Sequence, residues 1–121
     1  MTYFYKQTEP VKIPVPGNKL IEEHFGKVAT GGDQYSVAHM KAPAGWSEPA
    51  QTPEFDEITI MIRGKMKIIV NGEEEIVLKA GESFLNGKGT KVQYANPYKE
   101  ENEYWSVCMP AFSVERAKRT E

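Results

Sequence analysis

The Glu57 carboxylate is the side chain of this sequence best placed for acid–base chemistry. It opens a β-branched, apolar run whose alternate residues share a face, so an inward Glu57 takes Thr59 and Met61 with it. Beside apolar Met61 the carboxylate would be partly desolvated, and desolvation raises the pKa of a carboxyl group toward neutrality. Such a group can act as a general acid or base. Alternatively, Glu57 only exchanges hydrogen bonds with Gln51 or a water.

Several other side chains could contact a molecule bound beside Glu57. Gln51 and the Tyr94 hydroxyl could orient a carbonyl or hydroxyl group, and Val92 shares the Tyr94 face of its strand. Trp46 could cover the mouth of a cavity, or cover core at an interface. The residues expected to bind substrate are Gln51, Tyr94, His39, Met61, Trp46, Val92 and Cys108.

Two of these residues, His39 and Cys108, leave alternatives open. Lys41 has the same strand parity as His39, which directs His39 outward unless a bulge before Pro43 reverses the faces. His39 is then either a proton shuttle at the cavity rim or a structural histidine. Cys108 shares a face with Tyr104 and Ser106, and no base near it in the sequence would activate it as a nucleophile. Packing as a small apolar side chain is therefore the favoured role for Cys108.

Short strands separated by turns would position these residues. Alternating or β-branched segments bounded by Gly, Pro and Asn predict about eight to ten strands, the pattern of a sandwich or barrel. Asn71-Gly72 indicates a type I′ hairpin turn. Residues 20–27 fit a strand or a short helix, and Ser113 predicts the N-cap of a short helix over 113–119. The other expected strands are 35–41, 57–63, 65–70, 75–78, 83–86, 92–95 and 103–109.

Composition limits the class of protein and its partners. The 121 residues, 40% hydrophobic and 26% charged, predict a single globular domain over 1–121. A net charge of −2 from 15 basic and 17 acidic residues spread along the chain argues against nucleic-acid and membrane partners. The sequence has no secretory signal and a single cysteine, so we expect a cytoplasmic protein.

The first 17 residues predict an extended arm ahead of a barrel core over 34–110. Pro10, Pro14 and Pro16 prevent a helix there and disfavour a central strand. The aromatic residues at positions 3–5 are suited to lie across a second copy of the chain. We therefore expect a homodimer.

Two stretches of the sequence resemble the paired motifs of the cupin superfamily. They read GWSEPAQTPEFDEITIMIRG over 45–64 and GESFLNGKGTKVQYAN over 81–96. The start of the first motif, together with CMPAF and SVERAKR near the end of the sequence, resembles small single-domain cupins of the ethanolamine-utilisation type. The resemblance implies an all-β, single-domain jelly-roll β-barrel with a short C-terminal helix. The residues in register with the motifs are Gly45, Gln51, Pro53, Glu57, Gly64, Gly81, Gly87, Gly89, Val92 and Asn96.

The resemblance also implies where a metal ion would bind. In metal-binding cupins, two His and one Glu of the first motif and one His of the second hold a divalent ion. Glu57 alone carries over, because Gln51, Pro53 and Val92 occupy the other three positions. A transition-metal site needs three or four N, S or charged O ligands, so we expect no metal cofactor.

Two metal sites remain as alternatives. One would use Gln51, Glu57, His39 and water. The other would be an oxygen-only cation site formed by Glu57 and the acidic residues of the first motif, which are otherwise solvated loop carboxylates. Those acidic residues are Glu48, Glu54 and Asp56.

Together these features predict a cupin that binds a small organic molecule in a metal-free cavity. With Glu57 as the central acid or base, it would be a metal-independent lyase or isomerase that catalyses isomerisation, cyclisation, elimination or dehydration. A ligand-binding or sensory cupin without turnover is the first alternative. A divalent-metal-dependent cupin enzyme is the second.

Overall fold

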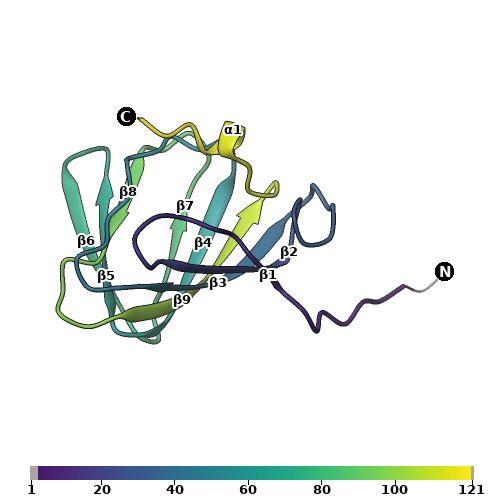
Figure 1. Ribbon diagram of the computed structural model, residues 1–121. Helices are drawn as coiled ribbons and strands as arrows, with labels where there is room; N and C mark the ends of the chain where they lie inside the picture. Colours follow the sequence, from purple (N-terminus) through teal and green to yellow (C-terminus); the bar gives the residue numbers. More distant parts are fainter. Residues whose placement is uncertain (1–2, 121) are drawn as a thin grey trace.

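Two antiparallel sheets face each other and form a barrel (Figure 1). A computed structural model describes residues 3–120. The larger sheet has the order β1-β2-β3-β9-β4-β7 and the smaller β6-β5-β8, which confirms the predicted all-β fold with a short C-terminal helix. The elements are β1 (Val11–Lys12), β2 (Leu20–Phe25), β3 (Ser36–Ala42), β4 (Asp56–Arg63), β5 (Lys65–Val70), β6 (Glu74–Lys79), β7 (Ser83–Asn86), β8 (Val92–Ala95), β9 (Asn102–Met109) and α1 (Val114–Ala117).

Strand β9 organises the larger sheet because it pairs with β3 on one side and with β4 on the other. Its residues alternate between the two faces, and Tyr104, Ser106 and Cys108 are buried. The register sets Ser106 beside Thr59 and Cys108 beside Glu57. The central strand therefore directs a hydroxyl and a thiol toward the interior near the β4 carboxylate.

The β5–β6 hairpin has the turn that its sequence predicts. Asn71 and Gly72 have φ of 54° and 71°, both in the left-handed region that a type I′ turn requires. The strands on either side pair in register, with Ile68 opposite Ile76. Met66 and Ile68 of this hairpin are fully buried.

Two segments differ in detail from the sequence prediction, and a third settles between its two alternatives. Residues 20–25 form the strand rather than the helix of those alternatives, because β2 pairs with β1 and β3. The larger sheet thus begins at Val11 and extends beyond the expected core of 34–110. The C-terminal helix has the predicted N-cap, with the Arg116 N–H donating to Ser113 Oγ at 3.1 Å, but it ends at Ala117 because Lys118 is left-handed.

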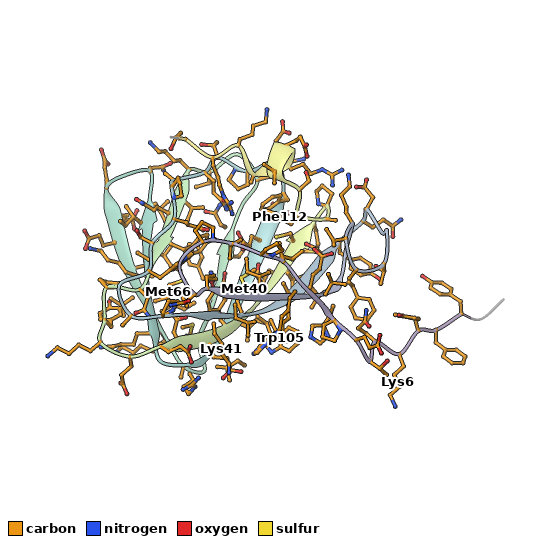
Figure 2. The ribbon with its side chains drawn as sticks, viewed as in Figure 1. Lys6, Met40, Lys41, Met66, Trp105 and Phe112 are labelled. Carbon is orange, nitrogen blue, oxygen red and sulfur yellow. The ribbon has the colours of Figure 1, made fainter. Side chains whose placement is uncertain are left out.

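Buried apolar side chains form two clusters. The smaller one groups Phe55, Cys108 and Ala117, with Phe112 packed against it. The larger one joins residues of both sheets, and Figure 2 shows two of the methionines of this region, Met40 and Met66, within the barrel. Its buried members are Ala42, Met61, Met66, Ile68, Leu78, Val92, Tyr94 and Tyr104.

The N-terminal arm projects away from the barrel, and the chain runs from it into β1 (Figure 1). Tyr3 and Phe4 are 90% and 91% exposed, whereas Tyr5 packs edge-on against Phe25 with ring centroids 6.3 Å apart. Residues 1 and 2 of the predicted arm lie outside the described part of the chain. Among residues 3–120, no helix is long and apolar enough to span a membrane.

We predict that Gly64→Ala destabilises the barrel more than Gly72→Ala does. Both glycines have left-handed φ, at 77° and 71°. A Cβ at position 64 would lie 3.1 Å from Asn102 Cα and from the Glu101 carbonyl oxygen, whereas none at position 72 meets an atom within 4 Å. Urea denaturation should show a loss of about 3 kcal/mol for Gly64→Ala and about 1 kcal/mol for Gly72→Ala. Equal losses would contradict the close approach of this turn to β9.

Candidate functional site

A cavity of about 400 Å³, here called the inner cavity, lies inside the barrel. Strands β2, β3, β4, β8 and β9 form its walls, and residues 13–15 and 112–114 also line it. Most of the lining is apolar, from residues such as Ala38, Met40 and Phe112. The polar side chains in the wall include Glu57, Thr59, Gln51, Tyr94, Ser106, Lys19, Glu48, Tyr104 and Arg119.

Glu57 lies on β4 with its carboxylate held by two hydroxyl groups. The Ser106 hydroxyl donates to Oε2 at 2.6 Å, and the Tyr94 hydroxyl donates to Oε1 at 3.2 Å. Burial raises the pKa of Glu57, and these hydrogen bonds and the charge of Lys19 offset only part of the increase. Glu57 is therefore a carboxyl group that holds a proton at higher pH than an exposed glutamate does.

Two buried tyrosines flank this carboxylate. Burial raises the pKa values of Tyr94 and Tyr104 well above the ordinary value of 10, and the charges of Glu57 and Glu48 raise them further. Both phenols therefore remain protonated at neutral pH. They can donate hydrogen bonds to a bound oxygen atom.

A buried lysine completes the polar wall. Lys19 precedes β2 and is 9% exposed. Its Nζ donates to the Tyr104 hydroxyl and lies 3.6 Å from the centroid of the Trp46 ring. Burial lowers the pKa of Lys19 to about 8, although the negative charges of Glu48 and Glu57 act in the opposite direction.

Glu48 and Arg119 stand beside Lys19. The sequence predicted Glu48 to be a solvated loop carboxylate, but its side chain is only 18% exposed and burial raises its pKa. Arg119 donates from Nε to Gln51 Oε1 at 3.3 Å, and its Nη2 lies 3.5 Å from Glu48 Oε2. Acidic and basic side chains thus lie next to one another in the lining of the inner cavity.

A second cavity of about 470 Å³, here called the outer cavity, adjoins the first. Trp46 lines it, together with the Pro43 to Pro49 loop and residues 15–17. Lys19, Glu48 and Arg119 line both cavities. The charged side chains therefore mark the boundary between the two spaces.

The structure brings together some of the residues expected to bind substrate and separates others. Gln51, Tyr94 and Cys108 line the inner cavity with Glu57. Met61 and Val92 do not line it, because they are fully buried in the larger apolar cluster. Both side chains face the barrel interior, as their strand positions predicted, but neighbouring side chains separate them from the cavity.

His39 does not line the inner cavity. Ala38 and Met40, its neighbours on β3, line the cavity, so His39 points to the other face of the sheet. Its ring nitrogens contact Glu22 Oε1 at 3.0 Å and Glu103 Oε2 at 2.6 Å. Burial lowers the pKa of His39, and these hydrogen bonds more than reverse the effect, so the pKa is raised overall. Its surroundings are those of a structural, ion-paired histidine.

Cys108 lines the cavity as a neutral thiol. Burial raises the pKa of Cys108 far above its usual value, and the charge of Glu57 adds to the increase. The thiolate, which is the reactive form, is therefore disfavoured. The structure agrees with the favoured packing role of this residue.

Five cavity residues were not among those expected to bind substrate, namely Lys19, Glu48, Tyr104, Ser106 and Arg119. Tyr104 and Ser106 had a usable signal, since they share strand parity with Cys108. Lys19 and Arg119 lie outside the strands and carried no periodic signal. The turn signals around Glu48 suggested only a loop.

The donor groups of this site do not fit a divalent metal ion. Pro53 and Val92 have no donor atom, and Gln51 Oε1 already accepts a hydrogen bond from Arg119. Within residues 3–120, no group of three His, Cys, Asp or Glu side chains is arranged to hold a metal. Lys19 and Arg119 also place positive charge near Glu57, which disfavours the binding of a metal cation there.

The acidic residues of the first motif have separate partners. Glu54 Oε2 lies 3.5 Å from Lys118 Nζ, and Asp56 Oδ1 accepts a hydrogen bond from the Lys88 N–H at 2.8 Å. Glu48 instead faces Lys19 and Arg119. These contacts do not assemble the oxygen-only cation site that the sequence left open.

Comparisons with known proteins agree with this architecture. The family model described as Ethanolamine utilisation protein EutQ matches residues 20–112. The EutQ protein of Clostridium difficile superposes with a TM-score of 0.64 at 20% identity, over 85% of this chain and 73% of that one. The polyketide cyclase RemF of Streptomyces resistomycificus superposes with a TM-score of 0.70 at 12% identity, over 97% and 90%. At these identities, the likeness to the solved structures shows the fold alone.

A longer protein contains a closely similar segment. The protein of Myxococcus xanthus (strain DK1622) described as endoribonuclease YbeY is 49% identical over 105 residues, which are 87% of this chain. The match spans 35% of that protein's length. This chain thus spans about one third of the relative that it matches.

We predict that Glu57→Gln stabilises the fold increasingly as pH rises. Because the folded-state pKa of Glu57 is above the unfolded value, the native state favours the protonated form. The wild-type free energy of unfolding therefore falls as pH rises from the unfolded pKa through the folded pKa, and a neutral amide in place of the carboxyl group removes that loss. Thermal unfolding at pH 4 and pH 8 should show a larger gain in Tm for the variant at pH 8.

Glu103→Gln provides a control of opposite sign. The hydrogen bond from His39 lowers the pKa of Glu103, so the carboxylate stabilises the fold above its unfolded pKa and this stability is lost on acidification. The control should therefore be less stable than wild type at pH 8 and closer to it in acid. A Glu57→Gln gain that is independent of pH would contradict the raised pKa of Glu57.

Proposed function

Because the chain belongs to the ethanolamine utilisation protein EutQ family and has the cupin fold, we propose that it is an enzyme with Glu57 as its acid–base group. The proposed substrate is a small organic molecule bound in the inner cavity. The volume of about 400 Å³ and the mainly apolar lining with a few convergent polar groups support this choice.

One observation carries the proposal, namely the environment of the Glu57 carboxylate. Its pKa is raised by burial, and two hydroxyl groups fix the positions of both oxygens. A general base or acid works best with a pKa near the working pH and a fixed orientation toward substrate. An exposed glutamate has neither property.

The other polar side chains can assist a reaction that moves protons without redox change. The neutral Tyr94 and Tyr104 phenols can donate to a carbonyl or hydroxyl oxygen. Lys19 and Arg119 can stabilise negative charge that develops on that oxygen. Isomerisation, cyclisation, elimination and dehydration need these elements, and the proposed class is therefore lyase or isomerase.

We predict that Glu57→Gln lowers turnover by about 10²- to 10⁴-fold with little change in ligand affinity. Small carbonyl compounds and hydroxy acids would be screened by thermal shift, and each ligand found would then be followed by NMR for conversion. Glu103→Gln is the matched control, because it removes a carboxylate from the outer face of the sheet.

The outcome also separates an enzyme from a sensory protein. Ligands that bind wild type and Glu57→Gln equally and are converted by neither would favour the non-catalytic binding protein. Equal conversion by both proteins would remove Glu57 from the catalytic role.

We further propose that the site functions without a metal ion, based on the donor groups at the four cupin metal positions. Protein purified without a chelating tag should contain well below one divalent ion per chain, as measured by elemental analysis. Its Tm and turnover should be unchanged by a chelator. A stoichiometric ion that is lost together with turnover would instead support the metal-dependent alternative.

Homodimer formation and a cytoplasmic location stay predictions. The exposed aromatic rings of Tyr3 and Phe4 support the first. Ile60, Ile62 and Leu85 also leave exposed apolar surface on the outer face of the larger sheet. Both features suit a second copy of the chain.

A further inference from the structure

The amine of Lys19 is a buried nucleophilic group, and the proposed acid–base chemistry uses only its positive charge. A lysine side chain is rarely so enclosed without a paired carboxylate in direct contact. No ion pair is found for Lys19 among the described residues at hydrogen-bonding distance, and its Nζ donates to the neutral Tyr104 hydroxyl instead. Its position in the wall of both cavities leaves the amine open to a bound molecule.

We propose that Lys19 forms an imine with an aldehyde or ketone bound in the inner cavity, an inference that rests on the proposed acid–base function of that cavity. The imine carbon would then activate the neighbouring C–H bond, and Glu57 would remove its proton. The substrate class is thus a small carbonyl compound with a hydrogen on the carbon next to the carbonyl.

The geometry around Lys19 limits where such a carbonyl compound can bind. The Trp46 ring covers one side of the amine, with its centroid 3.6 Å from Nζ. The Tyr104 hydroxyl contacts the amine from β9. The carbonyl carbon would therefore approach from the inner cavity, whose wall also contains Glu57. The outer cavity would leave room for a substituent on the carbonyl compound.

The charges that face Lys19 act in both directions on its protonation. Glu48 and Glu57 favour the ammonium form, whereas burial and Arg119 favour the neutral amine. Burial has the largest effect and brings the pKa to about 8. At pH 8 the neutral, nucleophilic fraction is then roughly a hundredfold larger than for an exposed lysine.

Groups in the cavity can transfer the protons that the imine step requires. The Lys19 nitrogen adds to the carbonyl carbon, and the resulting carbinolamine loses its oxygen as water with the two protons of the amine. Tyr104 accepts a hydrogen bond from Lys19 and keeps its own proton, so it can relay these protons to the departing oxygen. A protonated Glu57 can then protonate the imine nitrogen, and the carboxylate that remains removes the proton from the adjacent carbon to give an enamine.

Reductive trapping tests the imine directly. The full chain would be incubated at pH 8 with butyraldehyde and sodium cyanoborohydride, and the alkylated lysines would be located by peptide mass spectrometry. We expect Lys19 to be alkylated at least tenfold faster than Lys27. Lys27 is the matched comparison, because it also lines the inner cavity but is 48% exposed and lies 3.5 Å from Asp33.

Two variants separate a nucleophile from a buried charge. Lys19→Arg keeps the positive charge but cannot form an imine under these conditions, so labelling at position 19 should vanish while near-UV circular dichroism stays that of a folded protein. Lys67→Met removes an amine of β5 that lines neither cavity and pairs with Glu75 at 3.3 Å, so it should leave the labelling of Lys19 within twofold of wild type. Should Lys19→Arg fail to fold, the comparison of Lys19 with Lys27 in the wild-type chain still decides the question.

Exchange of acetone hydrogens for deuterium in D₂O, followed by NMR, separates this inference from the proposed function. Exchange that is lost at least tenfold in both Lys19→Arg and Glu57→Gln supports both. Lys19 labelling no faster than that of Lys27 overturns the imine and leaves the role of Glu57 intact. Rapid Lys19 labelling, with exchange that is the same in Glu57→Gln as in wild type, upholds the imine and overturns Glu57 as the base.

Discussion

The burial of one carboxylate, that of Glu57, is the constraint on which the arrangement of this barrel depends. A buried carboxylate is costly unless hydrogen-bond donors meet it, and here the donors come from β8 and β9. The β4–β9 register brings Ser106 next to Thr59, within reach of the carboxylate. A slip of one residue would turn Ser106 to the outer face and leave the carboxylate without its shortest hydrogen bond. The β4–β9 register therefore determines both the pairing of these strands and the hydrogen bonding of the buried carboxylate.

The segments outside the strands supply the positive charge of the site. Lys19 lies in the connection between β1 and β2, and Arg119 lies in the segment after α1. Backbone hydrogen bonds fix the latter, since the Thr120 N–H donates to the Ala50 carbonyl at 2.8 Å and the Thr52 N–H to the Lys118 carbonyl at 3.3 Å. Both segments thus contribute to the electrostatics around Glu57, and the cavity is complete only when they are packed against the barrel.

The positions that hold metal ligands in other cupins have different uses here. Gln51 accepts a hydrogen bond from Arg119, Val92 is part of the larger apolar cluster, and Pro53 is fully buried with its carbonyl accepting from the Gly89 N–H at 2.8 Å. The spacing of the two motifs is present, but at three of the four positions the side chains pack or accept hydrogen bonds instead of offering metal ligands. Of the four positions, only that of Glu57 retains a group that can transfer protons.

Most strands, the β5–β6 turn and the faces of the central side chains could be predicted from the residues alone, because alternation and left-handed turn residues act over short distances. The sequence thus identified Glu57 with Thr59, and Cys108 with Tyr104 and Ser106, as residues of one face. Which of these residues line a cavity, and which are covered as Met61 is, follows only from the packed barrel, because depth within a barrel depends on side chains from other strands. Packing also brings the charges of Lys19 and Arg119 near Glu57, since irregular backbone has no period from which proximity to a residue 38 or 62 positions away could be inferred.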